Sequence, residues 1–228
     1  MRRSPPTPTR RGPPGHKQAS RLKGTGLSRE RIVGAALAIV AEEGLAGLST
    51  RKIGERLHCE AMSIYHHVPS KQHLLDALVD QAIDSMQWPD PALSPMQQLS
   101  ASMHAYRAMA HRHPALFPLL AVHRLNTPTG VRFIERILGL VQAVVPDAQQ
   151  AARQFRILGY FLTGAALDET SGYARGPSAA EPVDGAFIAR ECPRLAAAAR
   201  YFQRDEWDRT FELGVEALLA AVARDGMS

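Results

Sequence analysis

The stretch Leu48-Ser-Thr-Arg-Lys-Ile-Gly-Glu-Arg-Leu57, followed closely by Ile64-Tyr-His-His-Val-Pro-Ser-Lys71, decides the fold of this chain. Ser49 or Thr50 is suited to cap a short helix. A two-residue turn at 58–59 and a second short helical segment at 60–67 follow, until a proline ends the segment. Two short helices joined by a tight turn are typical of helix-turn-helix proteins, in which the second helix enters the major groove of DNA.

Helical periodicity continues on both sides of this stretch. Ser28 is expected to cap a first helix that Gly44 ends, and Ser70 to cap a fourth helix with a regular apolar face. The proline-rich link 88–91 then interrupts the pattern. We therefore predict a helix-turn-helix DNA-binding domain over residues 28–88.

The remainder of the chain, 89–228, also shows helical patterns only. Ser94-Pro-Met-Gln97 forms a capping-box sequence at the start of a helix that runs to about Arg112. No alternating strand pattern interrupts the later segments. The prediction is an all-α fold of about ten helices, with apolar stripes at about 128–145, a long helix to about 169, a weakly helical segment at 187–201 and a last helix at 205–224.

Composition narrows the class of protein. The chain has 228 residues, is 45% hydrophobic and contains two cysteines, which fits a globular protein of a reducing cytoplasm and not a disulfide framework. The longest apolar run is too short to span a membrane. A phosphate loop, a Gly-x-Ser-x-Gly motif and a metal-ligand string are all missing from the sequence. We therefore expect neither an enzyme nor a resident metal or cofactor.

Positive charge is concentrated in the first third of the chain. Through Lys71 there are 13 Lys and Arg against 5 Asp and Glu, and beyond it 14 against 17. Seven of these basic residues lie in the segment 1–27, which is predicted to be a disordered arm. The arm either follows DNA phosphates or is a solubilising extension. Charge alone also permits an anionic membrane surface, but a helix-turn-helix lacks the large apolar face of a membrane-bound helix.

The motifs together resemble the DNA-binding domain of TetR-family repressors, and the tetracycline-repressor branch in particular. The resemblance rests on 48–57, 64–71 and Leu74-Leu-Asp-Ala-Leu78, together with Glu43-Gly44 at the end of the first helix. It is strong over about 27–83 and only architectural beyond that. The resemblance implies a homodimeric repressor with a palindromic DNA operator and a helical domain that binds a small molecule.

The resemblance also implies which residues contact DNA. Arg51, beside Thr50 at the start of the first motif helix, matches a position that reaches a base edge or a phosphate, and a guanidinium suits guanine. The alternative is an ordinary surface arginine. The recognition helix opens with three residues expected to face bases, and three further residues match phosphate contacts. These two sets are Ala61, Met62 and Ser63, and Tyr65, His67 and Lys71; Tyr65 could instead pack in the core.

Apolar and aromatic residues spread over several C-terminal helices are candidates to line a ligand cavity. The resemblance implies that His123, ahead of Pro128, could hold a magnesium–drug chelate, with Asp168 or Glu169 near the metal. Thr127 stands where the family has an arginine, which disfavours tetracycline itself, and ordinary core packing is the alternative for each residue. The predicted ligand contacts are Met103, Tyr106, His123, Phe133, Ile137, Phe155 and Leu158, with Met109, Leu120 and Phe161 as further candidates.

Two helices, near 151–168 and 205–224, are expected to form the homodimer interface. Small residues on the first (Gly159, Gly164, Ala165, Ala166) allow close approach, and the second carries the stripe Phe211, Gly214, Val215, Leu218 and Ala221. The alternative is that both stripes serve the core of one chain. The sequence thus predicts a repressor released from DNA by a small-molecule inducer. The second hypothesis is a constitutive DNA-binding or architectural factor that binds no ligand.

Overall fold

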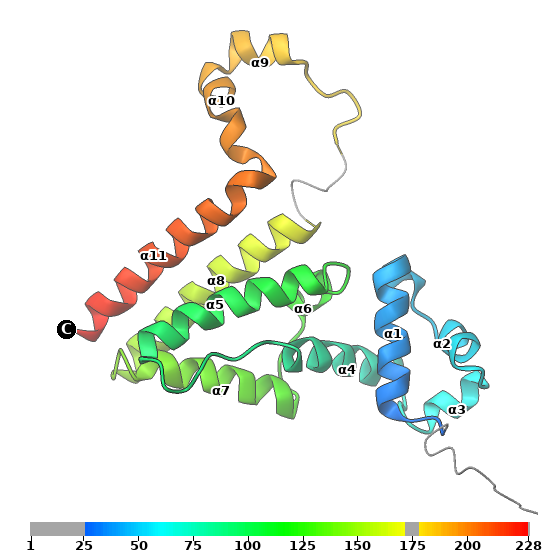
Figure 1. The fold of residues 1–228 in the computed structure, drawn as a ribbon. Helices are drawn as coiled ribbons and strands as arrows, with labels where there is room; N and C mark the ends of the chain where they lie inside the picture. The colour runs from blue at the N-terminus through cyan, green and yellow to red at the C-terminus, as the bar shows by residue number, and fades with distance from the viewer. Residues whose placement is uncertain (1–25, 172–177, 228) are drawn as a thin grey trace, which may run out of the picture.

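The computed structural model describes residues 26–171 and 178–227, and these residues form helices and no strand. The predicted arm, 1–27, lies outside the described residues except for its last two. Figure 1 shows a small N-terminal lobe, a larger helical body and a helical segment that projects from the body. The helices are α1 (Arg29–Glu43), η1 (Leu45–Gly47), α2 (Thr50–Leu57), α3 (Ala61–Tyr65), α4 (Lys71–Asp84), α5 (Pro95–Arg112), α6 (Phe117–Val122), α7 (Pro128–Gln142), α8 (Ala148–Ser171), α9 (Gly185–Glu191), α10 (Pro193–Ala198), η2 (Ala199–Phe202), η3 (Arg204–Glu206) and α11 (Trp207–Gly226).

Serine side chains begin the helices where the sequence predicted caps. Ser28 accepts a hydrogen bond from the Arg31 amide at 3.3 Å, and Ser49 and Ser70 cap α2 and α4 in the same way. At α5 the capping box is complete, because the Ser94 amide also donates to the Gln97 side chain at 3.0 Å. Each cap satisfies amide groups that have no partner within the helix.

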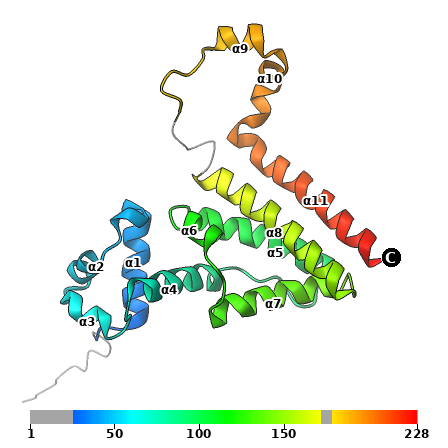
Figure 2. The same ribbon diagram turned by 180° about the vertical axis from the view of Figure 1, so that it is seen from behind.

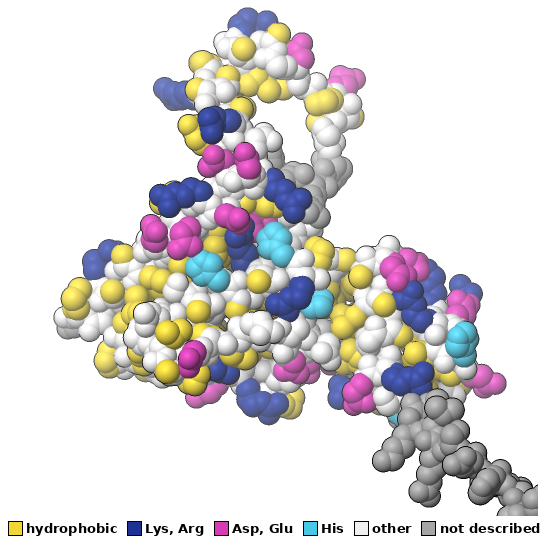
Figure 3. Space-filling model, in the orientation of Figure 1, with side chains coloured by type: hydrophobic (Ala, Val, Ile, Leu, Met, Phe, Trp, Pro, Cys, Tyr) yellow, Lys and Arg dark blue, Asp and Glu magenta, His cyan; other side chains and the backbone are white. Residues whose placement is uncertain are grey.

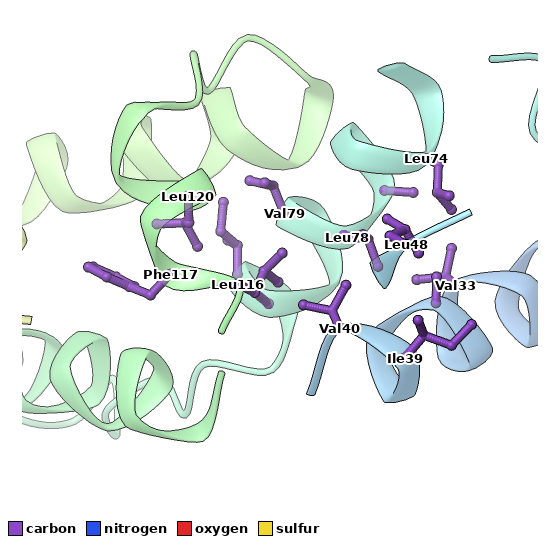
Figure 4. Packing of buried hydrophobic residues seen from close by; sticks show 14 of the residues in the cluster. Val33, Ile39, Val40, Leu48, Leu74, Leu78, Val79, Leu116, Phe117 and Leu120 are labelled. Atoms are coloured by element: carbon purple, nitrogen blue, oxygen red, sulfur yellow. The ribbon is translucent and has the colours of Figure 1, made fainter. Parts of the chain in front are cut away.

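Helix α4 joins the lobe to the body. Figure 4 shows Leu78 of α4 near Val40 of α1. Val79 of α4 lies near Leu116, the residue before α6, and near Leu120 of α6. All five of these side chains are at most 4% exposed. The hydrophobic core therefore continues from the helix-turn-helix region into the body, and a displacement of α6 is felt by α4 because close-packed interiors transmit strain.

The body is built from α5, α7, α8 and α11, which lie side by side in both ribbon views (Figures 1 and 2). A second buried cluster holds them together, including Leu99, Met103, Val141, Leu158 and Phe211. The predicted stripe of α7 is only partly buried, since Val131 at its start is 49% exposed. None of the described helices is both long and apolar enough to cross a membrane.

Residues 185–202 form the projecting segment of Figures 1 and 2, and none of these residues is buried. The sequence predicted one weak helix here with Pro193 inside it. The structure has two helices instead, because Pro193 is the first residue of α10 and Cys192 separates it from α9. A proline lacks the amide that a helix interior needs, but the first turn does not use that amide.

The predicted dimer stripes are partly wrong. Phe211 and Val215 are 3% and 1% exposed and pack within the chain, as does Ala166 of α8, which is fully buried. Gly214 faces the Phe161 ring. The apolar residues that these helices leave outward are others, among them Ile157 at 42% exposure and Leu213 at 48%. The periodicity of α11 identified an apolar face but could not tell which face meets another helix of the same chain.

Candidate DNA-binding surface and ligand cavity

The two motif helices expose the residues predicted to contact bases. Arg51 lies in the first turn of α2, and 75% of its side chain is exposed. On α3, Ile64 is fully buried and anchors the helix, while Met62 is 69% exposed. Thr50, Ala61 and Ser63 are half-buried at the same two helix starts. Met62 therefore presents its apolar side chain to solvent at the start of α3.

The three predicted phosphate contacts also lie on the surface. Tyr65 is 41% exposed, so its ring is not enclosed in the core, and His67 and Lys71 are exposed. Lys71 is the first residue of α4, where free amide groups and the helix dipole favour an anion. The three residues follow one another from the end of α3 into the start of α4. This order suits side chains that contact successive phosphates along a DNA strand.

Two basic residues of the motif are engaged within the protein. Arg56 of α2 pairs with Glu42 of α1 at 2.6 Å, and Lys52 pairs with Glu43. These contacts hold α2 against α1 and set the position of the turn. The charges of Lys52 and Arg56 are therefore compensated within the lobe, over which basic and acidic side chains lie intermixed (Figure 3). Arg51 has its own partner, since its Nη1 donates to Glu55 Oε1 at 2.7 Å one turn further along α2.

The turn between α2 and α3 depends on Gly54, to which sequence reasoning gave no role, and on His58, which lies in the predicted turn. Gly54 lies so close to the turn that an added Cβ would be 2.7 Å from the Cys59 carbonyl oxygen. His58 has φ 55°, in the left-handed region that a non-glycine residue seldom adopts. A glycine inside a short helix that a tight turn follows is the sequence signal that could have marked this close approach.

A cavity of about 580 Å³ lies in the body between α5, α7 and α8. All seven residues predicted to contact a ligand line it, and Leu120 does as well, whereas Met109 and Phe161 pack elsewhere in the cores. Whether a ligand touches them stays a prediction. Sequence reasoning missed several polar lining residues, which are Ser102, Arg156, Tyr160 and Thr163. The last three lie at intervals of four and three residues and so share a face of α8, and that spacing is the signal that could have found them.

Polar groups are few in this cavity. Burial raises the pKa of the Tyr106 phenol, and a hydrogen bond with Thr163 opposes that effect, so Tyr106 stays protonated and neutral. Ser102 is 3% exposed, and its hydroxyl has no hydrogen-bond partner within the structure. Phe133 packs on Tyr106 and on Trp88, whose other neighbour is the Arg136 guanidinium 3.9 Å above the indole.

His123 connects the cavity wall to α4. Its side chain is 11% exposed, and its Nε2 lies 2.9 Å from Asp76 Oδ1 of α4. Four residues further on, Thr127 caps α7 and donates its hydroxyl to Asp80 Oδ1 at 2.5 Å. The loop between α6 and α7 is thus hydrogen-bonded to α4 at two successive turns.

The expectation that Asp168 or Glu169 lies near His123 is wrong. Glu169 is buried on the opposite side of α8, where its Oε2 accepts from Arg107 Nε at 2.7 Å and lies 2.6 Å from His111 Nε2. Burial acts to lower the pKa of Arg107, but its hydrogen bonds to Glu169 and Asp208 outweigh burial and raise it. In the described part of the chain, no three His, Cys, Asp or Glu side chains gather where they could hold a metal.

Two histidines, His111 and His113, lie at the end of α5. His113 forms the cap of α5 beside Ser85, and its pKa is lowered by burial and by the neighbouring Arg112. His113 therefore favours the neutral form. His111 binds Glu169 rather than solvent.

A helix-turn-helix lobe whose last helix, α4, is packed and hydrogen-bonded to a body with a drug-sized cavity defines a class of protein: helical DNA-binding regulators with a ligand-binding domain. Comparison with known families agrees. Residues 32–78 match the family described as bacterial regulatory proteins, tetR family, and residues 89–225 match the tetracyclin repressor-like C-terminal domain. The chain belongs to the tetR family, so both the resemblance and the all-α fold inferred from the sequence are confirmed.

Curated relatives and solved structures cover nearly the whole chain. The tetracycline repressor protein class A from transposon 1721 of Escherichia coli is 26% identical over 211 residues, which are 88% of this chain and 92% of that protein. An HTH-type transcriptional regulator of Saccharopolyspora erythraea is 28% identical over 212 residues, covering 86% and 85%. The structure of Streptomyces coelicolor ActR in complex with actinorhodin is 28% identical with a TM-score of 0.70, covering 86% of this chain and 95% of ActR.

Proposed function

We propose that this chain is a ligand-responsive repressor that binds a palindromic operator as a homodimer and is released by a small-molecule inducer. The observation that carries the proposal is the hydrogen bond between His123, on the cavity wall, and Asp76, on α4. Because α4 also carries Lys71 of the DNA surface, one helix is shared by the two sites. An inducer that shifts this helix would therefore also shift part of the DNA surface.

The expected mechanism is competition for His123. A ligand that fills the cavity and hydrogen-bonds the His123 ring changes the Asp76 contact, and the Thr127–Asp80 bond lies one turn away on the same loop. A shift of α4 changes the separation of the two DNA-binding lobes of a dimer. Couplings between such sites are typically about 1–3 kcal/mol, or about 5- to 150-fold in operator affinity.

The proposed DNA contacts follow from the exposed face of the motif. Arg51 reads a base edge, with guanine as the base its guanidinium suits, and Met62 with Ala61 and Ser63 opens the helix that enters the major groove. Thr50 accompanies Arg51, and Tyr65, His67 and Lys71 bind phosphates. The exposure and placement of these side chains support these contacts.

The proposed dimer interface uses the outward faces of α8 and α11, including Ile157 and Leu213. Gly164 is exposed on the same side of α8, with no atom within 4 Å of an added Cβ, so a partner helix can approach closely. Two lobes related by a two-fold axis match the symmetry of a palindromic operator. The regulator works in the cytoplasm, where its DNA is, and has no catalytic role.

The test uses the full chain and an operator selected from random duplexes. Operator affinity is measured alone, with saturating actinorhodin, which the ActR structure contains, and with saturating tetracycline in the presence of magnesium. Wild type is compared with His123→Ala and with His104→Ala as a matched control, since His104 pairs with Glu212 on α11 and lies away from the cavity. Melting curves accompany each measurement.

We expect one of the two compounds to weaken wild-type operator binding at least about fivefold. His123→Ala should keep operator binding but lose most of that response, and His104→Ala should keep both. Full response in His123→Ala at unchanged stability would refute the proposed coupling. If neither compound changes the affinity of wild type or His123→Ala, the constitutive DNA-binding factor becomes the better description.

A further inference from the structure

The cavity lining carries a single full charge. Of the described residues that line it, Arg156 is the one basic side chain of permanent charge, and none is Asp, Glu or Lys. The rest of the lining is mostly aliphatic and aromatic. A ligand that enters this cavity thus meets a positive group with no acidic neighbour among the residues around it.

Arg156 is oriented by a neutral partner. Its Nη2 donates to the Tyr160 hydroxyl at 2.6 Å, and its guanidinium lies 4.8 Å from the centre of the Tyr160 ring one turn along α8. No carboxylate of the described residues forms an ion pair with it. Both side chains are exposed as well as lining the cavity, so they mark the place where it opens to solvent. The guanidinium keeps donors free for an acidic group.

The interior of the cavity holds a second unmatched group, the Ser102 hydroxyl. Ser102 is 97% buried on α5, lines the cavity and has no partner for its Oγ within the structure. A buried polar group without a hydrogen bond is unfavourable, and natural proteins keep few of them. A ligand carbonyl or hydroxyl would satisfy it.

We infer that the cavity binds an organic acid with a flat apolar body, whose acid group pairs with Arg156 at the mouth and whose carbonyl or hydroxyl oxygen meets Ser102 inside. This inference rests on the proposed ligand-sensing function and names its ligand class. The volume of about 580 Å³ suits a ligand of drug size, such as a three-ring compound. Arg156 supplies selection for charge, and the aromatic wall supplies most of the affinity.

The test measures binding of two isosteric probes by calorimetry. Anthraquinone-2-carboxylate and anthraquinone-2-carboxamide share the flat ring system and its carbonyl oxygens and differ in charge. The full chain is compared with Arg156→Gln, and with Arg153→Gln as the control. Arg153 is on the same helix, is exposed, bonds Gln150 at 2.8 Å and does not line the cavity.

Wild type and Arg153→Gln should bind the acid about tenfold more tightly than the amide, the lower end for a charged hydrogen bond because Arg156 is exposed. Arg156→Gln should bind the two probes about equally. The preference should also shrink at high salt, since screening weakens an exposed ion pair. Equal binding of both probes to wild type, an undiminished preference in Arg156→Gln, or no binding of either probe would overturn the inference.

Ser102→Ala tests the interior contact. The variant should melt at or above the wild-type temperature, because it removes a buried hydroxyl without a partner, and it should bind anthraquinone-2-carboxylate several-fold less tightly while binding anthracene-2-carboxylate, which lacks the carbonyls, as wild type does. An equal effect on both probes would refute the role of Ser102.

Operator affinity in the same samples separates this inference from the function on which it rests. Arg156-dependent preference for the acid without any change in operator binding would leave the ligand class standing and remove the inducer role. Release of the operator by acid and amide alike would support the inducer role and overturn the inferred ligand class.

Discussion

Gly54 gives the sharpest test of how the DNA-binding lobe is built. Replacing Gly54 with Ala adds a Cβ that would lie 2.7 Å from the Cys59 carbonyl oxygen and 3.5 Å from the Ala61 amide nitrogen. Both are backbone atoms that cannot rotate away, so the turn must move. Such overpacking costs about 1–3 kcal/mol, and the better helix propensity of alanine offsets about 1 kcal/mol of it.

The net expectation for Gly54→Ala is a loss of up to about 2 kcal/mol in the free energy of unfolding. For a chain of this size that lowers the melting temperature by up to about 8 °C. Operator affinity should fall further than stability alone explains, because the displaced turn carries α3 away from its position against α2.

Gly34→Ala is the matched control. Gly34 is an exposed residue within α1, and an added Cβ there meets no atom within 4 Å. The same chemical change should therefore stabilise the chain by up to about 1 kcal/mol and leave operator binding unchanged. Calorimetry measures the stability of both variants, and operator titration measures their affinity for DNA. A Gly54→Ala protein with the stability and operator affinity of Gly34→Ala would show that α2 and the turn do not approach as closely as described.

Three further predictions concern other parts of the molecule. His58→Gly should stabilise the fold by about 1 kcal/mol in denaturant melts, since glycine adopts φ 55° without strain; lower stability would contradict this. Because the pKa of His113 is lowered, the unfolded chain binds more protons and stability falls as the pH drops through 6.5; His113→Gln should flatten that dependence in melts from about pH 8 to about pH 5. Deleting residues 1–24 should reduce the salt slope of DNA binding but not operator preference, and an unchanged slope would refute the phosphate role of the arm.

Local signals in the sequence predicted the helices well. The caps Ser28, Ser49, Ser70 and Ser94 were predictable because a capping hydrogen bond joins residues three apart. The division of the predicted helix 187–201 into two was missed, because the sequence alone does not show whether Pro193 lies inside one helix or in the first turn of another.

The candidate sites were predictable in kind and less so in detail. Residues such as His123 and Phe155 combine an apolar body with helical spacing, which suffices to suggest a cavity wall. The partner of His123 did not follow from the sequence, because Asp76 is 47 residues away and only packing brings the two together. Ser102 and Arg156 escaped for the same reason. Ser102 has no hydrogen-bond partner and Arg156 has the neutral Tyr160 hydroxyl in place of a carboxylate, and partners are a property of the folded chain.

Trp88 has a spectroscopic consequence. Its indole carries the Arg136 guanidinium on one face and touches Phe133, a wall residue of the cavity, so a change of cavity contents alters the electric field at the ring. The chain has one other tryptophan, Trp207, beside His111 and Arg204 on the far side of α5. With Trp207 replaced by Phe, the fluorescence emission wavelength of Trp88 reports changes at the junction between the link 88–91 and the cavity. The emission can be followed in real time while the protein is bound to DNA.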